Sequence, residues 1–260
     1  MNNRDYGELI AWANEYTPLS TMKIQAVIFD LDNTLTHRDL SVQTFSRALF
    51  NTYKQQIDQS ASSAQAEILE TIRYIDHGGY PIRERMTAPT IGGSVAHALL
   101  KQLKWKKAPD LDELSDYWFN QFGLNAVMMP NAIKMLDQLR SEGFKLAIIS
   151  NGGHFTRHKI IEGLGIAHYF DVIMSSEKAG VSKPQAEIFH MTCQQLGVAP
   201  DHCLYVGDHP VNDYWGATQA GLDGLYLAGF HQSLAEHQPP LNKTIQNLPE
   251  ILAYIKQVNA

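Results

Sequence analysis

The 260-residue chain has few cysteines, no long apolar run and no excess of positive charge. Its two cysteines, Cys193 and Cys203, lack the spacing of a metal site, and so few thiols favour a reducing, cytoplasmic setting. No apolar stretch approaches the roughly 20 residues that a membrane span needs. The acidic residues within 1–20 are unlike a signal peptide. A formal net charge of -6, without any run of Lys or Arg, argues against nucleic acid as a partner.

What the chain does contain is typical of a folded protein with a sizeable core. Apolar residues make up 44% of the sequence and charged residues 18%, which excludes a disordered chain. The length allows one large domain or a core with an insertion. No internal repeat or low-complexity segment interrupts it.

The clearest local pattern is an apolar run that ends in two carboxylates. Residues 26–29 are largely β-branched and aromatic without alternation, the pattern of a strand buried on both faces of a parallel sheet. Asp30 and Asp32 follow at the carboxyl end of this strand, where open α/β sheets bind ligands. The alternative interpretation is a turn capped by Asp32 and Asn33.

A long helical pattern follows this first strand. Between residues 37 and 124, apolar residues recur at three- and four-residue spacing, which predicts about four helices. We therefore expect an N-terminal extension over 1–21 with one short helix, an α/β core made of 22–36 and 125–260, and an all-helical insertion over 37–124. The pattern leaves open whether the extension packs against the core.

After Pro130, strands and helices alternate regularly, which predicts βαβ units and a parallel sheet. Asn131 is the candidate N-cap of the first of these helices. Strands are expected over 144–150, 172–174, 203–206 and 224–227, and helices over 131–142, 155–164, 184–196, 211–220 and 244–258. The predicted fold class is α/β, a Rossmann-like parallel sheet with an inserted helical domain.

Further polar residues follow the later strands. Ser150 and Asn151 end the second strand just before a helix, where a hydroxyl and free backbone N–H groups favour an anion such as phosphate. A helix N-cap explains Ser150 equally well. Lys183 follows the third strand by a loop and precedes a proline and a helix. Asp208 ends the fourth strand, and Asp213 comes five residues later.

Together these segments resemble the four motifs of the haloacid dehalogenase-like hydrolase superfamily, most of whose members are phosphatases. The D-x-D-x-T sequence from Asp30, the strand end at Ser150, the Lys-Pro pair at Lys183 and the G-D-x-x-x-x-D sequence ending at Asp213 occur in the family's order. Each motif is short, but all four in order make the resemblance specific over residues 24–227. It implies a Rossmann-like core whose insertion is a helical cap of the C1 type (subfamily I), closing over the active site.

The resemblance implies a Mg²⁺-dependent phosphatase acting on a small phosphorylated metabolite. Asp30 would attack phosphorus and form an aspartyl-phosphate, and Asp32 would protonate the leaving alcohol and then deprotonate water. The metal would be held by Asp30, the backbone carbonyl of Asp32 and Asp208, with Asp213 in support. A carboxylate attacking a phosphate dianion at about 4 Å meets a repulsion of roughly 8 kcal/mol. A cation and the ammonium of Lys183 offset repulsion on that scale.

The same resemblance gives the phosphate three ligands, Ser150, Asn151 and Lys183. Lys178 is the competing lysine, but the Lys-Pro pair before an apolar helix favours Lys183. Two other functions stay open: a phosphomutase acting on a sugar phosphate, and a phosphate-ligand sensor that does not turn over. A haloacid dehalogenase proper is disfavoured because Asp32 has no task in displacing halide. Neither the substrate nor the oligomeric state follows from the sequence.

Several histidines and arginines are better explained without a function. His154 and His158 could chelate a metal from one helix face, but Arg157 and Lys159 beside them favour a solvent-facing helix. His209 could face either a substrate or solvent. Three residues of the insertion are candidate substrate contacts for which surface charge is the favoured explanation: His77, Arg83 and Arg85.

Overall fold

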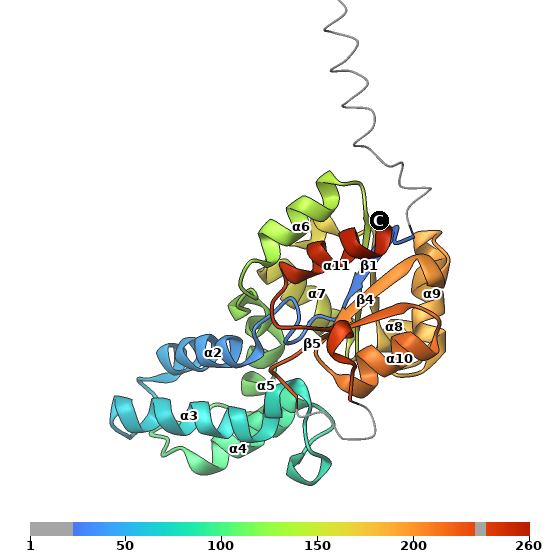
Figure 1. The fold of residues 1–260 in the computed structure, drawn as a ribbon. Coiled ribbons are helices and arrows are strands. Elements are labelled where there is room, and N and C mark those ends of the chain that lie inside the picture. The colour runs from blue at the N-terminus through green and yellow to red at the C-terminus, as the bar shows by residue number, and fades with distance from the viewer. Residues whose placement is uncertain (1–22, 232–237) are drawn as a thin grey trace, which may run out of the picture.

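A parallel β-sheet forms the centre of the molecule (Figure 1). The computed structural model describes residues 23–231 and 238–260, so the predicted extension over 1–21 and its helix lie outside the described residues. Within them, six strands pair in the order β3-β2-β1-β4-β5-β6, every neighbouring pair being parallel. The strands are β1 (Ala26–Phe29), β2 (Lys145–Ser150), β3 (Val172–Ser175), β4 (Cys203–Gly207), β5 (Asp223–Leu227) and β6 (Thr244–Ile245).

The sequence of β1 explains its central position. All four of its residues are fully buried, with Val27 and Phe29 in one apolar cluster and Ala26 and Ile28 in the other. The chain leaves β1 toward β2 on one side and later returns to β4 on the other, so the strand order reverses here. Such a reversal opens a crevice at the carboxyl ends of the strands, where ligands bind.

Helices cover both faces of the sheet. The Val27 face packs against α6 (Ala132–Ser141), α7 (His154–Gly163) and α11 (Glu250–Asn259), and the Ala26 face against α9 (Ala186–Leu196) and α10 (Gly216–Gln219). A short helix, α8 (Ser176–Ala179), follows β3. The predicted α/β class with a parallel sheet is therefore confirmed. Among the described helices, none combines the length and the apolarity that a bilayer crossing requires.

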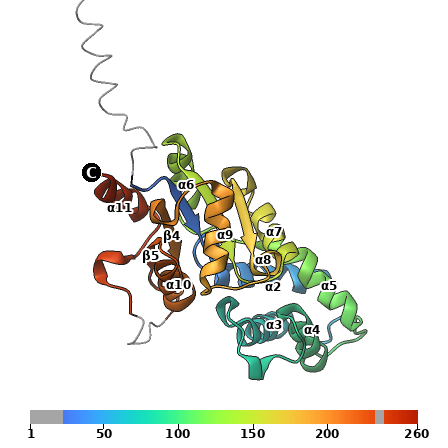
Figure 2. The same ribbon diagram turned by 90° about the vertical axis from the view of Figure 1, so that its right-hand side faces the viewer.

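The segment between β1 and α6 forms a helical layer beside the sheet (Figures 1 and 2). Its described α-helices are α2 (Arg38–Tyr53), α3 (Ala61–Asp76), α4 (Ile91–Gln102) and α5 (Leu111–Gln121). The side chains of Ser60, Thr90 and Asp110 accept backbone N–H groups at the starts of α3, α4 and α5. The expected helical insertion is present, and its division from the core at 37 and 124 stays a proposal.

The C-terminal prediction was wrong in one respect. Residues 244–258 do not form a single helix, because Thr244–Ile245 pair with Tyr226 and Leu227 as the edge strand β6. Ile245 is buried there, and α11 starts only after Pro249. A two-residue strand is too short to give a periodic pattern.

Three helix starts also differ from the prediction. Asn131 occupies the N-cap position of α6, but its φ is 66° and its side chain makes no capping hydrogen bond. The helix expected from Pro184 begins at Ala186, with Gln185 as N-cap. The helix expected over 211–220 is a π-helical segment, Pro210–Trp215, followed by α10. Its unusual winding brings Asp213 back beneath the end of β4, where Asp213 Oδ2 accepts the N–H of His209 at 2.9 Å.

Candidate functional site

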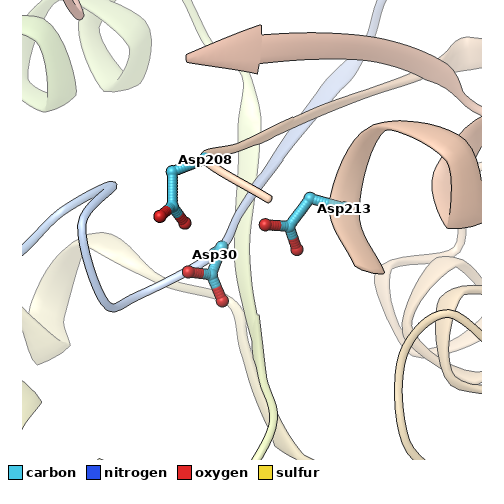
Figure 3. Close-up of side chains that lie close together, drawn as sticks. All are labelled: Asp30, Asp208 and Asp213. Atoms are coloured by element: carbon cyan, nitrogen blue, oxygen red, sulfur yellow. The ribbon is translucent and has the colours of Figure 1, made fainter. Parts of the chain in front are cut away.

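Three buried carboxylates meet at the carboxyl edge of the sheet (Figure 3). Asp30 follows β1, Asp208 follows β4, and Asp213 comes from the π-helical segment. One carboxylate oxygen of each lies within 4.8 Å of the others. The parallel register sets this convergence, because Phe29 is the partner of Val206 and the N–H of Asp30 donates to Val206 O at 2.9 Å.

Lys183 is the cation of this cluster. Its Nζ lies 2.6 Å from Asp30 Oδ1, 2.6 Å from Asp213 Oδ1 and 2.9 Å from the hydroxyl of Tyr205. Burial disfavours the charged lysine, but the two carboxylates outweigh that effect and raise the pKa of Lys183. The side-chain amide of Asn151 fixes the backbone of Lys183 through bonds to its N–H and its carbonyl, at 2.9 and 3.0 Å.

Lys183 neither balances the negative charge of the cluster nor provides a hydrogen bond to each of its carboxylate oxygens. Three carboxylates face one ammonium, and Asp30 Oδ2 and both oxygens of Asp208 are buried without a hydrogen bond. Burial raises the pKa of Asp30 well above its usual value, against Lys183, and raises that of Asp208 to about 6. His231 Nε2 lies 3.1 Å from Asp208 Oδ2. Unpaired buried carboxylate oxygens are the donor set of a hard divalent cation, so these residues fit a metal such as Mg²⁺.

Gly207 allows Asp213 to reach this cluster. A Cβ at position 207 would lie 2.4 Å from Cγ of Asp213, a contact that requires the backbone or the carboxylate to move. We expect Gly207→Ala to lower the free energy of unfolding by about 1–3 kcal/mol, as overpacking does. Urea denaturation checks this, with Gly153→Ala as the control. Its Cβ would have 3.4 Å to its nearest neighbour, so a similar loss in both variants would contradict the expectation.

Asp32 lies apart from the lysine and is paired with two arginines. Its Oδ1 accepts Arg38 Nη1 at 3.0 Å, and its Oδ2 accepts Arg157 Nη1. Burial alone would raise the pKa of Asp32, but the two guanidinium groups outweigh it and lower that pKa. The interpretation of Arg157 as part of a solvent-facing helix was therefore wrong, since its side chain turns inward from α7. Arg38 was not predicted at all.

A cavity of about 270 Å³ opens onto these groups. Asp30, Asp32 and Lys183 line it, together with the predicted phosphate ligands Ser150 and Asn151. Residues 79–81 of the helical insertion, which we call the cap below, also line it, as does Asn212. The structure thus brings five predicted residues to one cavity, with Asp208 and Asp213 beside it, while their individual roles stay predictions.

The turn of the cap that covers the cavity is bonded to the core. Asn33 Nδ2 donates to the carbonyl of Gly78 at 3.0 Å, and the N–H of Gly79 donates to Asp76 Oδ2 at 3.1 Å. Asp76 in turn accepts two bonds from Arg38, at 2.5 and 3.1 Å. The covering loop, the first cap helix and the loop after β1 therefore form one bonded network.

Tyr80, which lines the cavity, belongs to a cluster of rings that the sequence did not reveal. Tyr80 packs against His209 and His231, with ring centroids 5.0 and 4.4 Å apart. His209 Nδ1 also accepts the N–H groups of Val211 and Asn212, which caps the π-helical segment. The only sequence signal for Tyr80 was its place in the Gly-Gly-Tyr-Pro break of the cap.

The remaining candidates lie outside the cavity. Lys178 is exposed, which leaves Lys183 as the lysine of the site. His154 and His158 contact one another with ring centroids 4.3 Å apart, and His154 Nδ1 lies 3.0 Å from Ser175 Oγ. In the cap, His77 and Arg83 are exposed, and the Arg85 guanidinium stacks over the ring of Tyr74.

Comparison with known proteins agrees with this geometry. A glyceraldehyde 3-phosphate phosphatase of Methanothermobacter thermautotrophicus is 28% identical over 205 residues, covering 78% of this chain and 85% of that protein. A phosphoserine phosphatase of Thermus thermophilus is 33% identical over 100 residues, 38% of this chain and 40% of its own length. The magnesium-bound HAD hydrolase YfnB of Bacillus subtilis shares the fold, with a TM-score of 0.64 at 20% identity over 90% of this chain and 99% of that one.

A family model also matches most of the chain. The model describes haloacid dehalogenase-like hydrolases and covers residues 24–221, which include β1 and the site residues through Asp213. The resemblance seen in the four motifs is thereby confirmed. The chain belongs to the haloacid dehalogenase-like hydrolase family.

Proposed function

We propose that this hydrolase is a Mg²⁺-dependent phosphatase that cleaves the phosphate monoester of a small metabolite. The observation that carries the proposal is the pairing of Lys183 with Asp30 beside a buried cluster of unpaired carboxylate oxygens. Curated relatives named as phosphatases support a phosphate ester as substrate. An acidic metal site next to an ammonium suits phosphoryl transfer, in which positioning and charge neutralisation provide most of the catalysis.

Asp30 is the proposed nucleophile. Its Oδ1 is held by Lys183, while its Oδ2 has no hydrogen bond and so has a lone pair free for attack on phosphorus. Attack forms an aspartyl-phosphate and expels the alcohol, and water then cleaves the acyl phosphate. The ammonium of Lys183 reduces the repulsion between Asp30 and the phosphoryl oxygens. Ser150 and the backbone N–H of Asn151 bind those oxygens, since the side chain of Asn151 is engaged by Lys183 and the N–H of Gly152 donates to Ser176.

Asp32 is the proposed acid and base. It lines the cavity two residues after Asp30, near where the leaving oxygen would lie. Its two guanidinium partners favour its anionic form, which suits the removal of a proton from the attacking water. The same partners oppose protonation of Asp32, so Asp32 must take up a proton against their charge before it can act as an acid toward the leaving alcohol.

The metal would be held by Asp30, the backbone carbonyl of Asp32 and Asp208. Asp213 supports these ligands indirectly, because its two oxygens already accept Lys183 and the N–H of His209. When bound, the cation supplies positive charge next to the transferring phosphoryl group. Asp208 suits this task best, since its Oδ1 is buried without a partner and its Oδ2 has only His231 Nε2 nearby, at 3.1 Å.

Removal of divalent metal is expected to abolish hydrolysis of an aryl phosphate, and Mg²⁺ is expected to restore it. The experiment measures phosphate release after treatment with a chelator, with and without added Mg²⁺. A second readout is the melting temperature, which Mg²⁺ should raise because a ligand that binds the folded state stabilises it. Asp208→Asn should lose both responses, whereas Asp110→Asn, the same change at an exposed helix cap, should keep them. Full activity without divalent metal would contradict the proposal.

Two further experiments distinguish a phosphatase from a phosphomutase and from a sensor. Incubation with a sugar monophosphate gives free phosphate from a phosphatase and an isomerised sugar phosphate from a phosphomutase. A sensor would bind a phosphorylated ligand and release nothing.

A further inference from the structure

A second cavity of about 250 Å³ lies between the cap and the core, next to the one that contains Asp30. Asp32 links the two through its ion pairs: it lines the first cavity, and both of its guanidinium partners line the second. The walls of the second cavity come from the cap on one side and from the start of α7 on the other. Apolar cap residues that line it are Ile91, Trp118, Phe119 and Phe122.

The charge of this cavity is of one sign. Of the described residues that line it, Arg38 and Arg157 carry charge and none is acidic, although the chain as a whole is acidic. The hydroxyl-bearing residues Thr90 and Thr156 also line it. A small cavity with cationic and apolar walls is suited to an anionic group on a short carbon chain.

The two arginines differ in how many donors they have left. Arg38 gives Nε and Nη2 to Asp76 and Nη1 to Asp32, so it is engaged on all three nitrogens. Arg157 gives Nη1 to Asp32, while its Nε is buried without a hydrogen bond. A buried donor left unpaired is costly and marks a place for an acceptor. Arg157 is therefore the arginine that keeps a donor without a partner.

The backbone beside Arg157 makes room for its guanidinium. A Cβ on Gly152 would lie 2.8 Å from Arg157 Nη2 and 2.9 Å from Nε, too close for any other residue in this conformation. Gly152 also has a φ of 129°, which L side chains rarely adopt. The chain thus holds the guanidinium against the loop that follows β2, directly after Asn151 of the first cavity.

We propose that the leaving group of the substrate carries a carboxylate, which Arg157 binds in this second cavity. The inference rests on the proposed phosphatase function: with the phosphoryl group at Asp30 and the leaving oxygen near Asp32, the rest of the substrate extends toward Arg157. A planar carboxylate matches the fork of a guanidinium with two N–H donors, and it needs less room than a second phosphate. The substrate class is a short phosphorylated hydroxy acid.

The test compares two esters that differ in this one charge, 2-phosphoglycolate and its neutral amide. The wild-type enzyme is expected to prefer the carboxylate about 10- to 100-fold in kcat/KM, the range of a charge-assisted pair of hydrogen bonds. Arg157→Gln should bring the ratio close to one, and Arg157→Lys should keep part of it. Arg47→Gln, which removes an equal charge from the exposed surface of α2, should keep the wild-type ratio.

Because Arg157 also contacts Asp32, the decisive quantity is the ratio and not the rate. If Arg157→Gln lowered kcat/KM equally for both esters, Arg157 would act only by holding Asp32, and the inference would be overturned. A wild-type ratio near one would overturn it as well. A clear preference for ethylene glycol bisphosphate over 2-phosphoglycolate would replace the carboxylate by a second phosphate.

Two further measurements separate this inference from the proposed function. Hydrolysis of an aryl phosphate with Mg²⁺ tests the phosphatase alone, since that ester has no second anion. Calorimetric binding of the two glycolate esters to Asp30→Asn tests the second cavity without turnover. Tighter binding of the carboxylate, lost on adding Arg157→Gln, supports the inference even where hydrolysis is absent, and equal binding refutes it.

Discussion

Asp30→Asn is expected to lower the turnover of a phosphate ester by at least about 10⁴-fold, the scale on which removal of a catalytic nucleophile acts. The amide has no carboxylate oxygen for attack on phosphorus, and the lone pairs of Asp30 Oδ2 are replaced by N–H donors or a neutral carbonyl. Release of phosphate from an aryl ester in the presence of Mg²⁺ measures the effect. The aspartyl-phosphate should also disappear from a rapid acid quench of the variant.

The fold should survive this substitution. Lys183 keeps Asp213 as its partner at 2.6 Å, and the buried cluster loses one of its three negative charges. We therefore expect no loss in the free energy of unfolding, so that inactivity reports on chemistry. Asp110→Asn provides the matched control, since Asn serves as well as Asp at a helix N-cap. Near wild-type turnover in Asp30→Asn would show that Asp30 is not the nucleophile.

Lys183→Met is expected to harm both stability and catalysis. Methionine has a similar shape but no charge, so Asp30 and Asp213 would remain buried and close together without the ammonium that now lies 2.6 Å from each. Removal of one partner from a buried ion pair costs about 3–5 kcal/mol. Urea denaturation measures that loss, and phosphate release should fall together with it because the phosphoryl oxygens lose their nearest cation.

Lys178→Met separates this effect from a general loss of charge. Lys178 is exposed five residues before Lys183 and was the competing lysine in the sequence. Its replacement should change neither quantity measurably. If the two variants behaved alike, the buried ammonium would have no special part in the site, and the proposal would have lost its main support.

Much of the site could be predicted because its residues stand where the backbone alone fixes their position. Asp30 and Asp208 each follow a buried strand and Ser150 ends one, and parallel strands bring their carboxyl ends to one edge. The apolar runs that identify those strands are visible in sequence without any knowledge of contacts. Residues placed this way need only the correct strand assignments, and those agreed with the structure to within one or two residues for β1 to β5.

Residues that act across the interface between cap and core could not be predicted in the same way. Arg157 and Lys159 suggested a solvent-facing helix, but the direction of the Arg157 side chain depends on Asp32, 125 residues away. Arg38 begins the first cap helix, and Tyr80 lies in a turn of the cap. Their positions follow from how the cap packs on the sheet, which no local pattern contains. For the same reason the π-helical segment was interpreted as an ordinary helix.

Hydrogen bonds couple the covering turn of the cap to the loop after β1. Withdrawal of that turn breaks the Asn33–Gly78 bond, and any change in the spacing between α2 and the end of α3 strains the contacts of Arg38 with Asp76. Because Arg38 also binds Asp32, the position of the covering turn and the position of the Asp32 carboxylate depend on one another.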